Sequence, residues 1–420
     1  MTPSRFPLSL VVCLLVAGCA QGPSTGPFLF MWTGDADRKA SDFLAVIDAN
    51  PASPGYGSVV ASVPTGEVGT HPHHTEDVMP ASGHLLANGF GAGRTWLFDT
   101  STPRKPVVLA TFGEVGGYGH PHSFLRLPNG NVLATFQYRA GSGIGAAHDD
   151  HAAAPAAPAA AVTGGLVEMD ERGTLIRSGD ARDAAIADSH IYPYAALPMP
   201  AVDRVVSTTT DMNPTNTRAT SEWVQFWRLS DLTLLKSMAL PPGPRGDEHH
   251  FTGEPRLLPD GKSLYIHTFS CGLYLLRDVD RDVPTVTFVK GFEGMDCGVP
   301  ILTGKYWLQP VPASRSLIAL DISNPEHPRE VSTVTFGGEE SPHWVAIDPT
   351  GRRVVLNSGG HKASNRLFIV NFDPETGQLA IDDRFRDAGS TTPGVSMTGK
   401  VWPHGFTGTA APHGTVFSRQ

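Results

Sequence analysis

Seven segments of the chain repeat one pattern, in which an anchor residue, usually histidine, precedes a short apolar run that ends near a turn. The anchors are His74, His122, His190, His250, Cys297, His343 and His404. Neighbouring anchors lie between 46 residues (Cys297 to His343) and 68 residues (His122 to His190) apart. A repeat of this length can hold four short strands, the size of one β-propeller blade. The repeat therefore predicts an all-β, seven-bladed β-propeller.

The composition agrees with such a fold and excludes several others. The 45 glycines and 36 prolines among 420 residues would break the helices of a bundle or coiled coil. The net charge of −9 argues against nucleic-acid binding, which needs a basic surface. Since 40% of the residues are hydrophobic, the chain can bury a core and is not disordered.

Both ends of the chain are predicted to build one blade. The last anchor, His404, is followed by only a short tail, whereas three strand-like runs precede the first anchor at residues 28–32, 43–48 and 58–63. Pairing the tail with these runs would close the ring and remove two sheet edges. Residues 28–420 are therefore expected to form a single propeller domain.

One stretch, residues 141–162, interrupts the repeat. It carries an Ala/Pro-rich tract, which is typical of a flexible surface insertion. The tract begins beside His148, Asp149, Asp150 and His151, so a metal-capturing lid is the alternative interpretation.

The N-terminus is typical of an export signal. Arg5 supplies a positive flank and residues 8–16 an apolar run that is too short to span a bilayer. The run ends in Val-Ala-Gly before Cys19, as in bacterial lipoprotein signals, where the cysteine is lipidated. We expect a signal peptide at 1–18, a lipidated tether at 19–27 and attachment to the membrane on the periplasmic side, at the outer membrane. An ordinary signal peptide that happens to contain a cysteine is the alternative.

Histidine is over-represented, with 17 residues, and most anchors are histidines. The first strand of a blade starts near one end of the central channel, so anchors at that position could surround the axis. Neutral imidazole is a common ligand of copper, zinc, iron and nickel. The pattern predicts a metal site in the channel built from His73, His74, His122, His190, His250, His343 and His404. A water-filled channel with structural histidines is the alternative. His84, His267, His327, His361 and His413 fall outside the pattern and are expected to be structural.

Two further groups of residues could serve the channel. Glu76 and Glu254 flank the histidine anchors and are candidates for moving protons. Without the signal peptide and Cys19, the remaining cysteines are Cys271 and Cys297. Their spacing permits a disulfide, a metal ligand or two free thiols, and spacing alone does not decide between them.

Two stretches resemble a known family. Residues 41–48, with Ser53, Pro54 and Tyr56 after them, resemble the start of the selenium-binding protein family, which includes the methanethiol oxidases. The pair His73-His74 follows at the distance where that family has its own His-His pair. Late in the chain, residues 320–325, 328–329 and 336–338 resemble a second family stretch.

The resemblance implies a seven-bladed propeller and, for the oxidase branch, copper. The reaction in that branch turns methanethiol, oxygen and water into formaldehyde, hydrogen sulfide and hydrogen peroxide. The family's histidines carry over to His73, His74, His122 and His404. Two departures are visible: residues 75–82 lack the family's selenium-associated cysteine, and Gly405 stands where the family has an acid.

The histidine pattern and this resemblance together imply a metal-dependent oxidoreductase that oxidises a small thiol or similar sulfur compound with oxygen at the channel site, with copper as the expected metal and another transition metal as the alternative. Glycine-rich phosphate loops, Gly-x-Ser-x-Gly elbows and Cys-x-x-Cys motifs are absent from the sequence. Two other classes remain open. One is a non-catalytic propeller lipoprotein that acts as a binding scaffold or binds metal. The other is a polynuclear copper enzyme with another substrate, because the blades can bring many histidines to one cluster.

Overall fold

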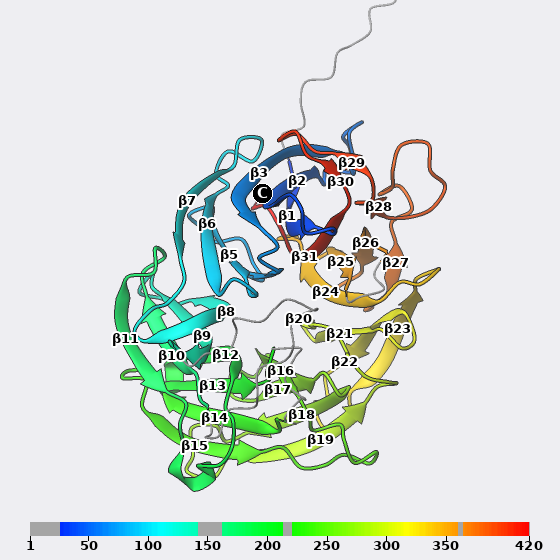
Figure 1. The fold of residues 1–420 in the computed structure, drawn as a ribbon. Coiled ribbons are helices and arrows are strands. Elements are labelled where there is room, and N and C mark those ends of the chain that lie inside the picture. The colour runs from blue at the N-terminus through cyan, green and yellow to red at the C-terminus, as the bar shows by residue number, and fades with distance from the viewer. Residues whose placement is uncertain (1–25, 142–161, 213–220, 360–363, 420) are drawn as a thin grey trace, which may run out of the picture.

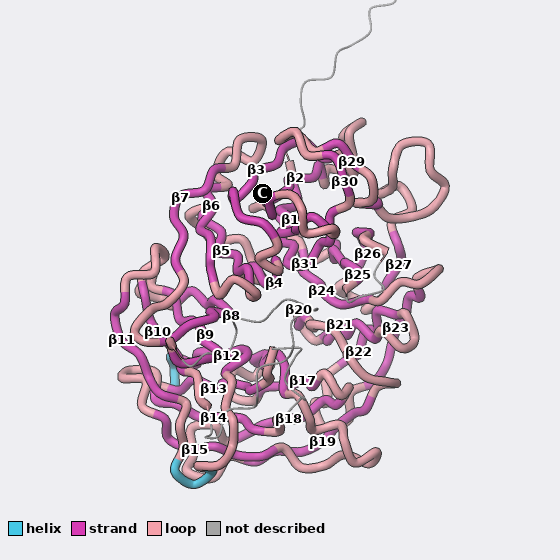
Figure 2. The backbone as a smooth tube through the Cα atoms, viewed as in Figure 1, coloured by secondary structure: helices cyan, strands magenta, loops and turns pink. Residues whose placement is uncertain are grey.

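The strands of the chain form a ring of blades around a central axis (Figure 1). The computed structural model describes residues 26–141, 162–212, 221–359 and 364–419. Within these ranges there are seven antiparallel blades of four strands each, so the predicted all-β propeller is confirmed. Helix is limited there to two single turns, η1 (Ala184–Ile186) and η2 (Pro200–Val202), as Figure 2 shows.

One blade is shared by the two ends of the chain, as predicted. Its strands are β3 (Val59–Val68), β2 (Ser41–Asp48), β1 (Phe28–Asp35) and β31 (Ala410–Phe417), in that order. β31 pairs with β1, with Val416 opposite Phe30, and it also contacts the innermost strands of both neighbouring blades. The last strand of the chain is therefore the innermost strand of the closing blade. Because the ring is closed in this way, no blade is left with an unpaired first strand.

The other six blades are continuous in the chain. With the innermost strand first, the first two of these blades are β4 (Pro72–Thr75), β5 (His84–Gly89), β6 (Arg94–Asp99) and β7 (Val107–Phe112), and β8 (Tyr118–Arg126), β9 (Val132–Arg139), β10 (Gly165–Met169) and β11 (Leu175–Asp180). The next two are β12 (Pro193–Met199), β13 (Arg204–Thr209), β14 (Trp223–Arg228) and β15 (Leu234–Ala239), and β16 (Thr252–Leu257), β17 (Leu264–Thr268), β18 (Gly272–Arg277) and β19 (Thr285–Gly291). The last two are β20 (Ile301–Thr303), β21 (Tyr306–Val311), β22 (Ser316–Asp321) and β23 (Arg329–Thr335), and β24 (Pro342–Ile347), β25 (Arg353–Ser358), β26 (Arg366–Phe372) and β27 (Leu379–Ile381). Three short strands lie outside this four-strand pattern: β28 (Val395–Ser396) pairs with β26, and β29 (Lys400–Val401) pairs with β30 (Thr407–Gly408).

The core lies between the faces of neighbouring blades. Central strands such as β1 are buried along their whole length, whereas outer strands such as β3 and β11 are partly exposed. Large aromatic side chains fill the space between blades; Trp32 of the closing blade packs on Trp96 of the next, with 5.4 Å between ring centroids. Burial of such side chains is the main term that holds blade to blade.

The innermost strands share an irregularity near their start. The pairing register shifts in six of them, directly after Pro72, Pro121, Pro193, Pro342 and Pro412, and between Thr252 and Pro255. Proline has no N–H for the ladder, and β-bulges that follow change the direction of side chains. The bulges therefore allow consecutive residues, such as His73 and His74, to be buried near the axis.

Cys271 and Cys297 form a disulfide, with Cα atoms 5.1 Å apart. The two cysteines are therefore a disulfide, and not a metal ligand or two free thiols, which their spacing along the chain could not decide. Within the described part of the chain, no helix is long and apolar enough to cross a membrane. Cys19 and the expected signal, as well as His148, Asp149, Asp150 and His151, lie outside the described residues.

Candidate metal centre

Three histidines meet beside the axis. His73 and His74 lie on β4 and His122 on β8, and all three are buried. Each offers a ring nitrogen, and these atoms lie within 4.8 Å of one another. The Nε2 atoms of His73 and His122 are 3.0 Å apart. Nitrogens at this separation can bind one metal ion at the usual bond length of about 2.0–2.1 Å.

The surroundings of His122 fix its tautomer. Its Nδ1 lies 2.8 Å from the main-chain carbonyl oxygen of Tyr194. A carbonyl only accepts hydrogen bonds, so Nδ1 carries the proton and donates it. The Nε2 atom is thus left with a lone pair that faces His73. Such a carbonyl partner is typical of metal-binding histidines, because it orients the ring.

Burial keeps the cluster neutral. It lowers the pKa of His73 and His74 well below the usual value, and the neighbouring histidines, above all His413 and His122, lower it further. Burial also lowers the pKa of His122 to about 3, against the hydrogen bond to Tyr194, which raises it. Neutral imidazoles are the form that binds metal, so these rings are ready for an ion at neutral pH.

His413 is a fourth member of the cluster, although sequence reasoning set it aside as structural. It lies on β31, with its ring centroid 4.2 Å from that of His73 and 4.9 Å from that of His343. The signal that could have found it is a dipeptide: Pro412-His413 repeats Pro72-His73, Pro121-His122 and Pro342-His343. The bulge that follows each proline puts these histidines at equivalent places in their blades.

The donor set fits a metal ion. Within the cluster, the Nδ1 atoms of His73 and His413 are buried and have no hydrogen-bond partner among the described residues. Buried polar atoms normally have a partner, so unpaired atoms in such a cluster point to a missing ligand. Imidazole nitrogens suit copper, zinc, iron or nickel, and the geometry does not select among them.

Three of the predicted ligands lie elsewhere. His190 is hydrogen-bonded through Nδ1 to the Val162 N–H at 3.1 Å. His250 is half-buried and its ring packs 4.0 Å from that of His249. His404 lies between β29 and β30, with Nδ1 2.7 Å from the Ser62 hydroxyl. The structure thus brings His73, His74 and His122 together, with His413 and His343 next to them, and leaves these three outside.

A cavity of about 560 Å³ reaches the cluster, with His74 in its lining. Glu254 lines the same cavity, and its carboxylate accepts a hydrogen bond from Arg256 Nη1 at 3.0 Å. Asp77 pairs with the same guanidinium at 2.7 Å. Burial raises the pKa of Glu254 to about 7, against the Arg256 charge, which lowers it. A carboxyl with such a pKa can take up or release a proton near neutral pH.

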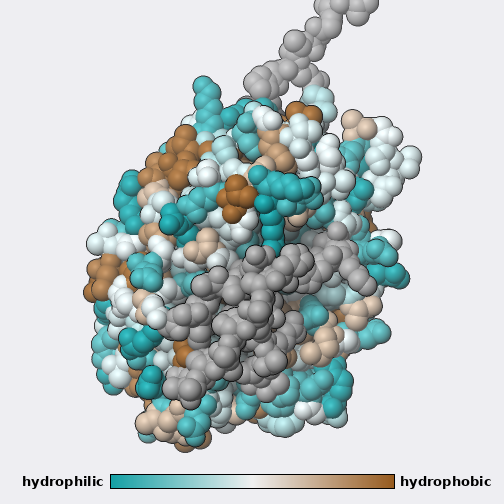
Figure 3. All heavy atoms as spheres, in the orientation of Figure 1, coloured by the Kyte–Doolittle hydropathy of each residue, from teal (hydrophilic) through white to brown (hydrophobic). Residues whose placement is uncertain are grey.

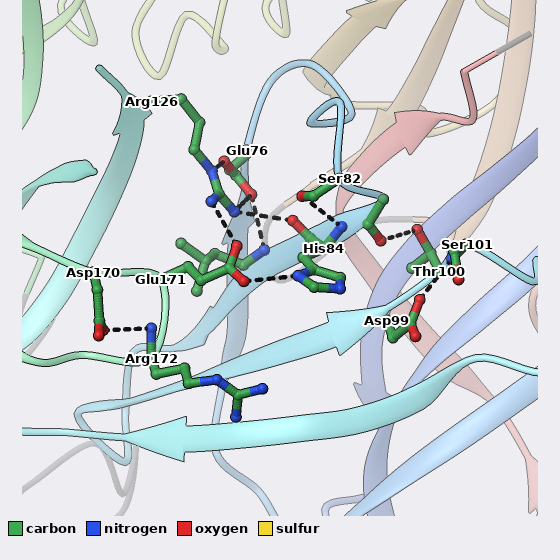
Figure 4. A network of polar contacts seen from close by, with 12 residues as sticks. Glu76, Ser82, His84, Asp99, Thr100, Ser101, Arg126, Asp170, Glu171 and Arg172 are labelled. Atoms are coloured by element: carbon green, nitrogen blue, oxygen red, sulfur yellow. Dashed lines mark hydrogen bonds and ion pairs between the residues drawn. The ribbon is translucent and has the colours of Figure 1, made fainter. Parts of the chain in front are cut away.

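Glu76, the other predicted proton carrier, is held on both sides. Arg126 donates from Nε to Glu76 Oε1 at 2.7 Å, and the Leu86 N–H donates to Oε2 at 2.9 Å. Figure 4 shows Arg126 between Glu76 and Glu171, which in turn contacts His84. Burial raises the pKa of Glu76, whereas Arg126 lowers it. Glu76 lines the cavity, and these bonds hold its carboxylate in place there.

Comparisons with known proteins give local sequence matches. No protein-family model matches the chain. Selenium-binding protein 2 of Arabidopsis thaliana is 28% identical over 122 residues, which is 26% of this chain and 24% of that protein. The methanethiol oxidase of Hyphomicrobium sp is 32% identical over 108 residues, 24% of each. The chain spans about a quarter of the length of these curated relatives.

Solved structures agree over nearly the whole chain. A hypothetical selenium-binding protein from Sulfolobus tokodaii superposes with a TM-score of 0.70 at 16% identity, covering 94% of both chains. A periplasmic gluconolactonase of Pseudomonas aeruginosa gives a TM-score of 0.60 at 14% identity, over 93% of this chain and 98% of that one. At these identities the likeness shows the fold. Fold and site define a β-propeller protein with a buried histidine cluster. The local sequence matches support its recognition as a divergent relative of the selenium-binding proteins.

Proposed function

We propose that the protein is a copper-dependent oxidoreductase that oxidises a small thiol with oxygen. The observation that carries this proposal is the group of three buried, neutral histidines, whose ligand atoms lie within 4.8 Å of one another. Local similarity to a methanethiol oxidase supports copper and a sulfur substrate. The cavity beside His74 supplies room for that substrate.

His73, His74 and His122 would hold the metal, with His413 as the fourth ligand. Copper in such a site would lower the pKa of a bound thiol and pass electrons from sulfur towards oxygen. The chain's own residues prepare the site. The Tyr194 carbonyl holds the His122 ring with Nε2 free. Glu254 would accept a proton in the cavity, with Arg256 holding its carboxylate in place.

The experiment is an assay of the purified, copper-loaded protein with methanethiol and oxygen. We expect formaldehyde, hydrogen sulfide and hydrogen peroxide to form in equal amounts. His74→Ala combined with His122→Ala should abolish the reaction, whereas His404→Ala, outside the cluster, should retain it. Absence of product with the wild type, or equal activity of the double variant, would contradict the proposal.

A centre with more than one copper is the second candidate. It is favoured by His343, whose ring lies 4.9 Å from that of His413. Burial lowers the pKa of His343 to about 4, so it too is available as a neutral ligand. A ratio of two or more copper ions per chain, falling to one in His343→Ala, would select this candidate. The scaffold alternative predicts one large apolar patch, and the coloured part of the face in Figure 3 shows separate groups of apolar side chains.

We also propose export and lipid attachment through Cys19. The disulfide between Cys271 and Cys297 supports an oxidising compartment. Cys19→Ser should move the protein from the membrane fraction to the soluble fraction of the periplasm. Retention of that variant in the membrane fraction would contradict lipid attachment.

A further inference from the structure

Strand β12 supplies a tyrosine where four other innermost strands supply a histidine. In those four strands, the residue that follows the proline at the bulge is His73, His122, His343 or His413. β12 has the same proline, Pro193, and the same shift of pairing register after it, and its next residue is Tyr194. Tyr194 is buried. It therefore takes the place in its blade that the histidines take in theirs.

Tyr194 is held in one position beside the cluster. Its carbonyl oxygen accepts three hydrogen bonds, from His122 Nδ1 at 2.8 Å, Ser123 Oγ at 3.0 Å and Thr135 Oγ1 at 2.7 Å. All three donors belong to the neighbouring blade, on β8 and β9. The tyrosine ring packs edge-on against Phe269, with 5.2 Å between ring centroids, and lies 4.2 Å from the ring of His122. Because main chain and ring are both fixed, the phenol hydroxyl has a defined position.

The hydroxyl of Tyr194 reaches a second member of the cluster. It lies 3.2 Å from Nε2 of His74, and the two rings meet edge-on, with 5.6 Å between their centroids. A phenol hydroxyl can donate or accept a hydrogen bond, so it can pair with Nε2 whether or not that nitrogen carries the proton. The bond uses one ring nitrogen of His74. The other, Nδ1, is thus the one that can bind a metal while the bond is kept.

One residue thus holds two candidate ligands that come from two other blades. Its carbonyl orients His122 of β8 and its hydroxyl orients His74 of β4. Partners that orient a metal-binding histidine typically account for about 10-fold to 100-fold in metal affinity. Phenylalanine at position 194 would keep the carbonyl and the packed ring and remove only the hydroxyl. The contact with His74 can therefore be tested separately from the contact with His122.

We propose that Tyr194 is a positioning residue for His74 at the metal centre, and this rests on the proposed function. Its hydroxyl sets the orientation of the imidazole ring, so that Nδ1 of His74 binds the copper ion while Nε2 stays bonded to Tyr194. Tyr194 acts through His74 and makes no bond to the metal itself.

The experiment measures Cu²⁺ affinity by competition with a chelator, together with the electron paramagnetic resonance spectrum, for the wild type, Tyr194→Phe and Tyr192→Phe. Tyr192→Phe is the matched control, because the Tyr192 hydroxyl lies 3.2 Å from Nδ1 of His190, a histidine outside the cluster. We expect Tyr194→Phe to bind copper about 10-fold to 100-fold more weakly than the wild type, with a changed nitrogen-coordinated signal. Tyr192→Phe should keep both the affinity and the signal.

A double-mutant cycle with His74→Ala shows whether the hydroxyl acts through that ring. His74→Ala alone and His74→Ala combined with Tyr194→Phe should bind copper equally, within about twofold, because the hydroxyl then has no ring to orient. Thermal unfolding of each variant confirms that it is folded. Tyr194→Phe is a mild change, since it keeps the buried ring.

A Tyr194→Phe variant with the affinity and the signal of the wild type would overturn the proposal, as would a wild type that binds no copper. A loss that persists in full in the His74→Ala background would also overturn it. So would a tyrosinate-to-copper absorption band that Tyr194→Phe lacks, because it would mean that Tyr194 binds the metal directly. None of these measurements uses a thiol or oxygen. If thiol oxidation is absent and these differences are present, the proposed reaction fails and the role of Tyr194 stands.

Discussion

Metal affinity of the histidine cluster should hardly change between pH 8 and pH 5. A histidine with the ordinary pKa of about 6.5 is nearly all protonated at pH 5, which lowers its availability to metal about 30-fold. Three such ligands together would lose about 30,000-fold in affinity, or about 6 kcal/mol. In this cluster burial has already lowered the pKa of His73 and His74 well below 6.5 and that of His122 to about 3. A pKa of about 3 leaves roughly 99% of His122 neutral at pH 5.

The assay is a competition titration with a chelator of known pH dependence, carried out at pH 5, 6, 7 and 8. A short peptide with three histidines serves as the control and should show the steep loss. We expect the protein to lose less than about tenfold over the same range. A loss of more than about 1,000-fold would refute the reasoning, because it would mean that the rings carry protons at pH 5 and are not held neutral by burial.

Three further predictions follow from individual contacts. His413→Ala should weaken metal binding by about 100-fold or more in the same titration, because it removes the ring against His73; an affinity equal to that of the wild type would exclude His413 as a ligand. The pKa of Glu254 is higher in the folded state than in the unfolded state. Between pH 4.5 and 7 the folded state therefore keeps a proton that the unfolded state has released. The free energy of unfolding of the metal-free wild type should thus fall by up to about 3 kcal/mol as the pH rises from about 4.5 to 7. Glu254→Gln should flatten that part of the curve in urea unfolding, and an unchanged slope would contradict the assignment. Cys271→Ser combined with Cys297→Ser opens a link between residues 26 apart and should lower the free energy of unfolding by about 3–4 kcal/mol, a change that reducing agent should reproduce in the wild type and not in the double variant.

The ring of blades could be predicted from the sequence because its cause is local and repeated. Short apolar runs and turns recur at blade spacing, and the surplus runs at the N-terminus left one way to close the ring. The same repeat placed the pair His73-His74 and His122 on the innermost strands of neighbouring blades, and their rings do meet. These features depend on strand order and spacing, both of which are visible in a sequence.

The last blade shows why other features of the site could not be predicted from the sequence. Pro403-His404 and Pro412-His413 are equivalent as dipeptides, and only the pairing of β31 with β1 decides which of them lies on an innermost strand. His190 and His250 keep the spacing of the repeat but lie outside the cluster, because they precede β12 and β16, whereas His74 and His122 lie on their innermost strands. The disulfide likewise depends on the distance between Cys271 and Cys297 in space, which spacing along the chain does not give.

Copper content with electron paramagnetic resonance tests the central claim most directly. The protein is loaded with Cu²⁺, dialysed against a weak chelator and measured beside two variants, His404→Ala and the double variant His74→Ala with His122→Ala. We predict at least one copper ion per chain, with a nitrogen-coordinated signal, in the wild type and in His404→Ala, and loss of both in the double variant. A wild type without bound copper, or a double variant with the same copper and the same signal, would contradict a metal centre built on these histidines.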